Sequence, residues 1–200
     1  MKANGSRQKG DAFYDKRYIR EFSKGKRAIE EWSWYPIWAR ACEWLIDIGA
    51  ASLLDVGCGP GRGASVLASK MAELNRSIRY EGWDFSGYAI DRAKELCLDG
   101  EFVFRQCDVF EQQSDRWDGF DAYWFTEVLE HVDNDQKLLE MVPEGRAVFL
   151  SVPRFLCTGH VRKFDGIEDV AQRYLGRIAF RHIEQITKNH LVACGVRKGL

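Results

Sequence analysis

The chain has 200 residues, of which 46% are hydrophobic and 30% are charged, and its formal net charge at pH 7 is -1. This length and composition are typical of one globular domain with a sizeable core, and they exclude a disordered or fibrous chain. No apolar run approaches the roughly 20 residues of a membrane span, and the N-terminal stretch MKANGSRQKGDAF lacks the apolar core of a secretory signal. We therefore expect a cytoplasmic protein without a membrane segment.

The charges are unevenly distributed along the chain. Residues 1–46 carry a net charge of +4, residues 47–145 carry -11 and residues 146–200 carry +6. Basic ends around an acidic middle are typical of a protein with an anionic partner, but ordinary surface charge gives the same pattern. The six cysteines form no C-x-x-C pair and most lie in apolar segments, so we expect buried thiols rather than disulfides or a zinc site.

The elements that the residue pattern predicts begin after a polar, basic stretch of residues 1–27, whose first ten or so residues we expect to be disordered. Residues 28–48 form one helical candidate, in which tryptophan and aliphatic residues recur at spacings of three and four. Because Pro36 suits the first turn of a helix, this helix is expected to begin near Tyr35.

Strands and helices then alternate. Short apolar segments predict strands at residues 52–57, 78–84, 102–107, 120–126 and 147–152. Three- and four-residue periodicity predicts helices at 62–74, 88–98, 134–141 and 168–175, with Ser86 as an N-cap. The last segments, 178–186 and 191–196, predict two strands joined by a short turn. This order indicates an α/β fold with an open, mostly parallel, doubly wound sheet and an antiparallel hairpin at one edge.

The stretch LLDVGCGPGRG, residues 53–63, carries the first chemical signal. A strand runs into glycines at positions 57, 59, 61 and 63. In a doubly wound sheet, ligands bind at the carboxyl ends of the strands, and glycines there let the backbone turn sharply and approach a ligand closely. The helix that follows presents N–H groups and the positive end of its dipole, which attract a carboxylate, a ribose or a phosphate.

Three kinds of glycine loop compete for this stretch. A phosphate-binding P-loop is rejected, because no lysine follows the glycines. A dinucleotide loop is matched weakly by Gly59, Gly61 and Ala64, with Asp84 at a suitable distance. The third is an S-adenosylmethionine loop, in which an acid stands two residues before the first glycine, as Asp55 does before Gly57.

Three segments together, LLDVGCGPGRG, YEGWDFSGYAI and FDAYWFTEVLEHV, resemble class I S-adenosylmethionine-dependent methyltransferases over roughly residues 50–155. The aromatic stretches YDKRY and YPIW and the short C-terminal hairpin are similar to those of small bacterial members. The resemblance implies a Rossmann-like, seven-stranded sheet. It also implies two parts, a basic and aromatic helical lid at residues 1–47 and a methyltransferase domain at residues 48–200.

The same resemblance implies that S-adenosylmethionine is the cofactor and S-adenosylhomocysteine the product. Residues of the glycine loop would line the methionine end: Asp55, Gly57, Cys58, Gly59 and Gly61. Asp84 would accept hydrogen bonds from the ribose hydroxyls, because the two oxygens of a carboxylate match a vicinal diol. Further residues would surround the adenine and the sulfonium: Phe85, Asp108 and Val109 for the adenine, and Thr126 and Glu127 for the sulfonium.

The segment TEVLEHV adds a cluster of candidate catalytic residues, Glu127, Glu130 and His131, which His160 of TGHVRKF could join. It is similar to clusters in ubiquinone-pathway O-methyltransferases and in small-RNA 2′-O-methyltransferases, some of which use a metal. Three uses stay open: a divalent metal, a histidine general base, or a pocket that only positions the substrates. We assign no metal ligand, and a divalent metal is not favoured.

Aromatic and basic residues outside these motifs are candidates for the walls of the site. Tyr14, Tyr18, Tyr35 and Trp38 would form the lid or the substrate wall, although for Trp38 and Trp44 we favour plain core packing. Arg154, Arg162 and Lys163 fall near the expected substrate mouth, where they would bind an acidic group or serve only as surface charges.

The leading functional hypothesis is methyl transfer to an oxygen of a small molecule or glycan, which could be anionic. An RNA methyltransferase acting on a ribose hydroxyl is the alternative, because aromatic residues are interleaved in the basic stretch KRYIREFSKGKR. The sequence pI of about 6.4 argues against it. A non-catalytic S-adenosylmethionine-binding protein and a dehydrogenase are further alternatives.

Overall fold

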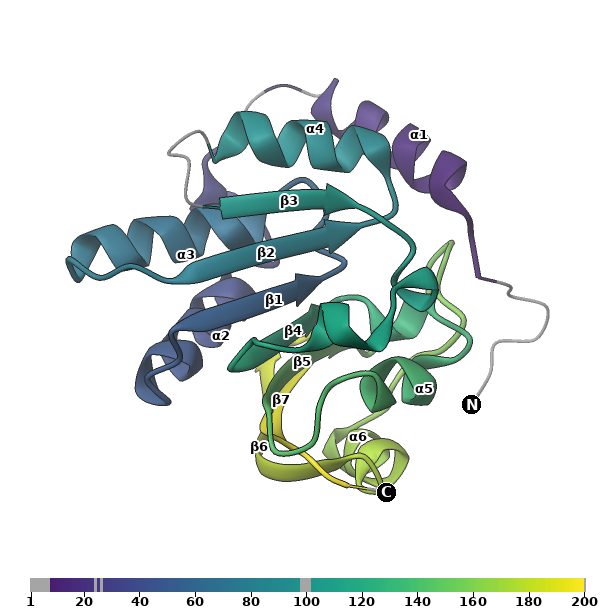
Figure 1. Cartoon of the computed structure of the whole chain (residues 1–200). Coiled ribbons are helices and arrows are strands. Elements are labelled where there is room, and N and C mark those ends of the chain that lie inside the picture. The colour runs from purple at the N-terminus through teal and green to yellow at the C-terminus, as the bar shows by residue number, and fades with distance from the viewer. Residues whose placement is uncertain (1–7, 24, 26, 98–101, 200) are drawn as a thin grey trace.

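The computed structural model describes residues 8–23, 25, 27–97 and 102–199 and contains a seven-stranded sheet in the order β3-β2-β1-β4-β5-β7-β6 (Figure 1). The strands are β1 (Ser52–Val56), β2 (Arg79–Asp84), β3 (Phe102–Gln106), β4 (Ala122–Thr126), β5 (Ala147–Pro153), β6 (Ile178–Thr187) and β7 (His190–Arg197). Strands β1 to β5 are parallel, and β7 runs antiparallel to both β5 and β6. The predicted α/β architecture is confirmed, including the antiparallel hairpin at one edge.

Each face of the sheet packs against its own set of helices, because side chains alternate along a strand. Leu53 and Trp124 face a core shared with α2 (Tyr35–Asp47), α3 (Arg62–Glu73) and α4 (Gly87–Leu96). Leu54 and Phe125 face a second core, which includes residues of α5 (Asp135–Glu140) and α6 (Ile167–Tyr174). The side chain of Ser86 caps α4 by accepting the N–H of Ala89 at 3.1 Å, as predicted.

The strand order reverses direction between β1 and β4, since β1 pairs with β2 on one side and with β4 on the other. The connections that leave the two strands therefore diverge and leave a crevice at their carboxyl ends, which is where open α/β sheets bind ligands. This topology places the glycine loop after β1 and the segment after β4 beside each other.

The N-terminal part differs from the prediction, because the residue pattern gave no separate helix before residue 28. Helix α1 (Asp11–Phe22) lies against α4 (Figure 1), and the hydroxyl of Ser86 donates to Asp15. Helix α2 begins at Tyr35, as Pro36 predicted, and residues 29–31 form only a short 3-10 turn. The disorder expected for about the first ten residues falls mainly on residues 1–7, which lie outside the described residues. Residues 24 and 26 of the basic stretch also lie outside them.

Two further expectations are decided by the fold. None of the six cysteines, all of which lie in the described part of the chain, forms a disulfide, as expected. Cys42 and Cys58 are buried and three others are half-buried, but Cys157 is exposed, so the expectation of buried thiols is wrong for Cys157. None of the helices in the described part of the chain is both long and apolar enough to cross a membrane.

Arg162 is not at a substrate mouth but is buried, with 3% of its side chain exposed. Its guanidinium donates to three main-chain carbonyls within residues 129–133, which comprise the 3-10 turn Leu129–His131 after β4 and the two residues that follow it. The carboxylate of Asp135 lies 3.4 Å from it and accepts hydrogen bonds from Arg173 at 2.6 and 2.7 Å and from the Tyr174 hydroxyl at 2.7 Å. This network fixes the turn that carries the predicted catalytic cluster.

We expect the Asp135→Ala variant to lower the free energy of unfolding by about 3–5 kcal/mol, because it leaves a buried guanidinium without its counter-charge. Urea denaturation followed by circular dichroism measures this change. Asp165→Ala is the matched control, since Asp165 forms an exposed ion pair with Lys163 and should be dispensable. Equal effects of the two variants would contradict a structural role for the buried network.

Candidate active site

A cavity of about 450 Å³ opens at the carboxyl ends of β1, β2 and β4, where the strand order reverses. The loops after these strands form one wall, and α1 with the start of α2 forms the other. All but one of the predicted site residues line it: Asp55, Gly57, Cys58, Gly59, Asp84, Phe85, Asp108, Val109, Thr126, Glu127, Glu130, His131 and His160. Parallel strands bring these motifs together, because their carboxyl ends share one edge of the sheet.

The glycine loop is a tight turn whose main-chain N–H groups are already bonded within the fold. Gly57 has a φ of 74°, and a Cβ on it would lie 2.5 Å from the side chain of Val128. The N–H groups of Gly57 and Cys58 donate to the carbonyl of Trp83, and that of Gly59 donates to Asp84. The loop thus allows close approach of a ligand, but the N–H groups of these three residues are already used within the fold.

Gly61 is the predicted cofactor residue that is absent from the described cavity lining, and the structure gives it another task. Its φ is 77°, and a Cβ would lie 2.9 Å from the Cα of Ala93 in α4. Gly61 therefore allows the start of α3 to pack against α4. Its contact with the cofactor stays a prediction.

Asp84, at the end of β2, is a buried carboxylate with a fixed orientation. Its Oδ1 accepts the N–H of Ser86 and its Oδ2 accepts the N–H of Gly59, both at 2.9 Å. Burial raises the pKa of this carboxyl to about 6, against the hydrogen bonds, which lower it. Each oxygen keeps capacity for a further hydrogen bond, so the group can accept two neighbouring hydroxyls from the cavity.

Asp55, in β1, is 2% exposed, and only one of its two carboxylate oxygens has a hydrogen-bond partner among the described residues. Its Oδ2 accepts the hydroxyl of Tyr80 at 2.8 Å, whereas its Oδ1 has no hydrogen-bond partner among the described residues. Burial raises the pKa of Asp55 to about 7, and the nearby charge of Asp84 adds to the rise. A buried oxygen without a partner at the cavity wall can accept a hydrogen bond from a ligand.

Asp108 combines a structural and a cavity-facing position. Its Oδ1 caps the short 3-10 turn Val109–Glu111 by accepting the N–H of Phe110 at 2.9 Å, and the residue also lines the cavity. Asp108 is therefore both a turn cap and a cavity residue.

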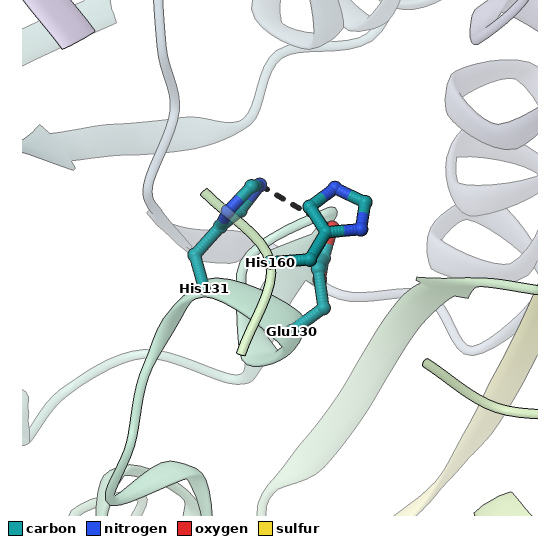
Figure 2. Close-up of side chains that lie close together, drawn as sticks. All are labelled: Glu130, His131 and His160. Atoms are coloured by element: carbon teal, nitrogen blue, oxygen red, sulfur yellow. Dashed lines mark ion pairs between the residues drawn. The ribbon is translucent and has the colours of Figure 1, made fainter. Parts of the chain in front are cut away.

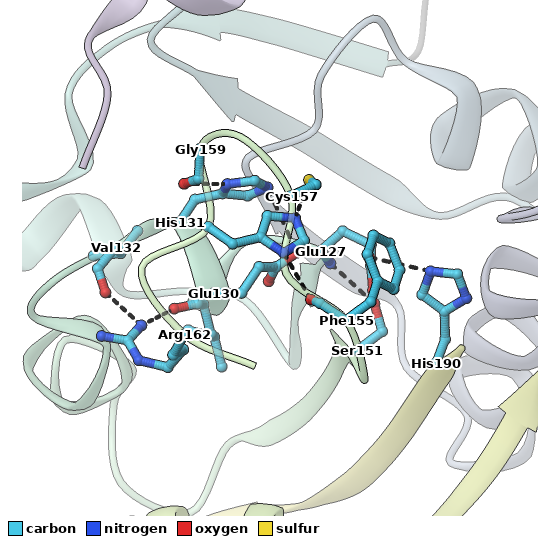
Figure 3. A network of polar contacts seen from close by, with 12 residues as sticks. Glu127, Glu130, His131, Val132, Ser151, Phe155, Cys157, Gly159, Arg162 and His190 are labelled. Atoms are coloured by element: carbon cyan, nitrogen blue, oxygen red, sulfur yellow. Dashed lines mark hydrogen bonds and ion pairs between the residues drawn. The ribbon is translucent and has the colours of Figure 1, made fainter. Parts of the chain in front are cut away.

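Glu127 follows β4 and adopts a φ of 58°, a left-handed conformation that is strained for glutamate. Its N–H donates to the hydroxyl oxygen of Ser151, whose own proton is donated to Oε1 of Glu127, each at 2.9 Å (Figure 3). Oε2 lies 3.5 Å from Nε2 of His190. Burial raises the pKa of Glu127 to about 7, while hydrogen bonds from Ser151 and Trp34 and the charge of Arg17 act against the rise.

Glu130, His131 and His160 converge at the same end of the cavity (Figure 2). Glu130 is fully buried, and neither of its carboxylate oxygens has a hydrogen-bond partner among the described residues. Nδ1 of His131 lies 3.0 Å from the carbonyl of Gly159, and Nδ1 of His160 lies 3.1 Å from that of Phe155. A carbonyl only accepts, so both protons are assigned to Nδ1 and both Nε2 atoms are left as acceptors.

The charges of this cluster are set by burial. Burial lowers the pKa of His131 to about 3 and also lowers the pKa of His160, so both imidazoles are neutral at pH 7. Burial raises the pKa of Glu130 well above its ordinary value, and the charge of Glu127 adds to this. Ligand atoms of the three residues lie within 4.8 Å of one another, so this carboxylate and two neutral imidazoles fit a divalent cation.

Sequence reasoning missed several cavity residues, among them Arg17, Trp34, Phe155 and Cys157. The sulfur of Cys157 lies 3.0 Å from Nε2 of His160. Arg17 could have been found from the spacing of Tyr14, Tyr18 and Glu21, which places one face of α1 on the cavity.

The structure separates the candidates for the lid and the mouth. Tyr14, Tyr18 and Trp38 line the cavity, so the core packing favoured for Trp38 is incomplete. Trp44 packs against Phe149, as favoured. Other candidates lie outside the described cavity lining: Tyr35, Arg154, Arg162 and Lys163. Arg154 instead donates to the carbonyl of Asp165 and to Gln185.

A family model described as "Methyltransferase domain" matches residues 49–174. The methyltransferase domain of bacterial CtHen1-CN is 22% identical over 80% of this chain and 97% of that chain, with a TM-score of 0.60.

Two other solved structures match at lower identity. The 1,6-didemethyltoxoflavin N1-methyltransferase of Burkholderia thailandensis, solved with 1,6-didemethyltoxoflavin and S-adenosylhomocysteine, is 16% identical over 97% of this chain and 93% of that chain, with a TM-score of 0.66. The cyclase SpnF is 14% identical over 98% of this chain and 99% of that chain, with a TM-score of 0.70. At such identities the likeness shows a shared fold.

The raised pKa of Asp55 has a consequence for stability. The folded state binds this proton more tightly than the unfolded state, so the free energy of unfolding falls as pH rises from about 4 to about 7. We expect Asp55→Asn to remove this part of the slope and to be more stable than the wild type at pH 8, by on the order of a few kcal/mol, with little difference at pH 4. Urea denaturation at several pH values measures it.

Asp121→Asn serves as the control of opposite sign. The pKa of Asp121 is lowered through hydrogen bonds from Ser52 and the N–H of Ala51 that outweigh its partial burial. Its stabilising effect is present above its ordinary pKa, so the amide should be less stable than the wild type at pH 7. Identical pH slopes for the wild type and Asp55→Asn would rule out the raised pKa assigned to Asp55.

Proposed function

The chain belongs to the family of methyltransferase domains, and from that premise we propose that it transfers a methyl group from S-adenosylmethionine to an oxygen atom of a small-molecule or glycan acceptor. The observation that carries the proposal is the carboxylate of Asp84, which two backbone N–H groups hold in place and which lines the cavity where the strand order reverses. The amino acid, nucleoside and sulfonium parts of this cofactor each meet a suitable group in that cavity.

S-adenosylmethionine is the cofactor, and the residues present fit it. Asp84 accepts the ribose hydroxyls on the lone pairs that its two backbone partners leave available. Oδ1 of Asp55, which has no partner among the described residues, accepts a hydrogen bond from the methionine end of the cofactor. The left-handed turn at Gly57 and Gly59 keeps side chains away from the backbone there. Asp108, Val109 and Phe85 bind the adenine, as the resemblance implied.

The N-terminal segment, residues 1–47, serves as the lid of a methyltransferase domain at residues 48–200. Support comes from α1, whose Tyr14, Arg17 and Tyr18 line the cavity on the side opposite the strand ends. The hydroxyl of Tyr18 would lie 3.1 Å from a Cβ at Gly59, so α1 reaches the glycine loop itself.

Glu127 is the group best placed to receive the proton of the acceptor hydroxyl. Its carboxylate is held at the cavity wall by Ser151, and its pKa of about 7 suits a base at neutral pH. His131 is a weaker base, because its pKa is about 3. When bound, the cofactor supplies the methyl group, which passes from its sulfonium sulfur to the acceptor oxygen while the C–S electron pair stays on sulfur.

A divalent cation is the alternative means of activating the acceptor. Glu130, His131 and His160 would hold it, and it would act as a Lewis acid on the acceptor oxygen. The proposal does not include this cation, and activity measurements with and without metal test it.

We expect Asp84→Asn to weaken binding of S-adenosylhomocysteine about tenfold to a hundredfold, because hydrogen bonds to a charged acceptor contribute about 1.5–3 kcal/mol. Binding to the wild type should also weaken below about pH 6, where Asp84 becomes protonated. Isothermal titration calorimetry measures both effects. Asp91→Asn on α4 is the control, since Asp91 is exposed, and NAD is the control ligand.

Tighter binding of NAD than of S-adenosylhomocysteine by the wild type would contradict the cofactor assignment. So would equal affinities for S-adenosylhomocysteine in Asp84→Asn and Asp91→Asn, because the ribose contact is the specific feature of Asp84.

We expect Glu127→Gln to reduce methyl transfer by a factor on the order of 10²–10⁴, as for loss of a general base, while affinity for S-adenosylhomocysteine changes only a few-fold. Transfer of radiolabelled methyl to small hydroxylated molecules, glycans and RNA measures it and identifies the acceptor class. Reactions with EDTA, magnesium or manganese test the cation. Full activity of Glu127→Gln, or activity that only a metal supports, would overturn the assigned base.

A further inference from the structure

We propose that His190, a residue of the C-terminal hairpin, positions the carboxylate of Glu127 by directing its Nε2–H at Oε2. The inference rests on the proposed role of Glu127 as the base. His190 belongs to none of the sequence motifs and lies outside the described cavity lining, so it acts through Glu127 rather than on a substrate.

The sheet register brings the hairpin to the site. Thr126 at the end of β4 pairs with Ser151 of β5, and Pro153 at the end of β5 pairs with His190 at the start of β7. Glu127, which follows Thr126, therefore lies alongside both Ser151 and His190 (Figure 3). The ring of Phe155 lies edge-on to that of His190, with centroids 5.8 Å apart, and His190 is only 4% exposed.

The hydrogen bonds around His190 assign its proton to Nε2. The N–H of Asn189 donates to the hydroxyl oxygen of Thr187 at 3.2 Å, and this oxygen lies 2.8 Å from Nδ1 of His190. The hydroxyl proton finds an acceptor if it is donated to Nδ1, which makes Nδ1 an acceptor and leaves the proton on Nε2. His131 and His160 have the opposite arrangement, because carbonyl groups face their Nδ1 atoms.

Nε2 of His190 is buried, and it has no hydrogen-bond partner among the described residues. Oε2 of Glu127, 3.5 Å away, is the acceptor that it faces. Since a buried N–H without an acceptor is costly, the contact should shorten when Glu127 is ionised.

With this contact Ser151 donates to Oε1 of Glu127 and His190 donates to Oε2, in addition to the hydrogen bond that Trp34 gives this carboxylate. These donors fix the plane of the carboxylate and favour its charged form against the effect of burial. Other charged or titratable groups that act on Glu127 or His190 are Arg17 from α1, Glu130 from the turn after β4, and His160. Loss of His190 should therefore make Glu127 harder to ionise and less well oriented.

The experiment measures the protein itself and needs no acceptor. Long-range ¹H–¹⁵N spectra of the imidazoles, recorded with EDTA, report which nitrogen of His190 carries the proton. The titration of the Glu127 carboxyl, followed by ¹³C NMR and identified with Glu127→Gln, is compared in His190→Leu, which lacks the donor, and His190→Gln, which keeps an N–H. His182→Leu is the control, since His182 is an exposed residue of the same hairpin near Glu184.

We expect an Nε2–H tautomer at His190 and a rise of about one unit in the pKa of Glu127 in His190→Leu, reversed in part in His190→Gln and absent in His182→Leu. Affinity for S-adenosylhomocysteine should stay within a few-fold. If His190→Leu does not fold, Thr187→Val removes the hydroxyl that fixes the tautomer, and a mixture of tautomers is then expected.

An Nδ1–H tautomer in the wild type, or a Glu127 titration that His190→Leu does not move, would overturn the inference. Failure of the proposed function is distinguishable, because it appears as unchanged methyl transfer in Glu127→Gln while the tautomer and the titration shift remain. With an acceptor in hand, His190→Leu should lower kcat with little change in the KM for S-adenosylmethionine.

Discussion

Buried negative charge at one edge of the sheet is the constraint around which this molecule is built. The described residues that line the cavity include six acidic and only three basic side chains. Four of the acids have raised pKa values, chiefly because burial disfavours their charged forms: Asp55, Asp84, Glu127 and Glu130. A ligand with positive charge near these carboxyl groups favours their ionised forms, because its charge offsets the cost of burying theirs. S-adenosylmethionine carries a sulfonium and an ammonium group, so its charge is complementary to the site.

The glycine loop and the N-terminal segment are joined by one side chain, Arg62, at the start of α3. It forms an ion pair with Glu21 of α1 at 2.5 Å, and its guanidinium lies over the ring of Trp32 at 3.9 Å from the centroid. The first turn of α3 thus holds α1 on the cavity. Closure of the cavity and formation of the cofactor loop depend on the same few residues.

The sheet could be predicted because its signals are local. Alternating apolar strands, the proline at the start of α2 and the serine cap of α4 are all visible along the chain. The first helix was harder, because its polar residues outnumber the aromatic side chains that face the cavity. Long-range ion pairs were harder still: Arg162 has the composition of a surface residue, and only the fold brings Asp135 to it.

Some features of the candidate site could likewise be predicted from the sequence, and others depend on the fold. Asp84 and Glu127 could be placed from motifs, because a residue at the end of a strand has a known place in a parallel sheet. The sequence could not assign partners to them, since Ser151 and His190 reach Glu127 only through the register of β4, β5 and β7. Nor could it find the internal use of the loop's N–H groups, which depends on the close approach of β2 to the turn.

The most direct test of complementary charge is the number of protons exchanged when S-adenosylmethionine binds. Isothermal titration calorimetry at pH 6.5, in buffers of different ionisation enthalpy, measures this number for the wild type and for Asp55→Asn. Because Asp55 and Glu127 have pKa values of about 7, the account predicts that cofactor binding releases protons, and that Asp55→Asn releases fewer. A binding enthalpy independent of the buffer, or a net uptake of protons, would contradict it.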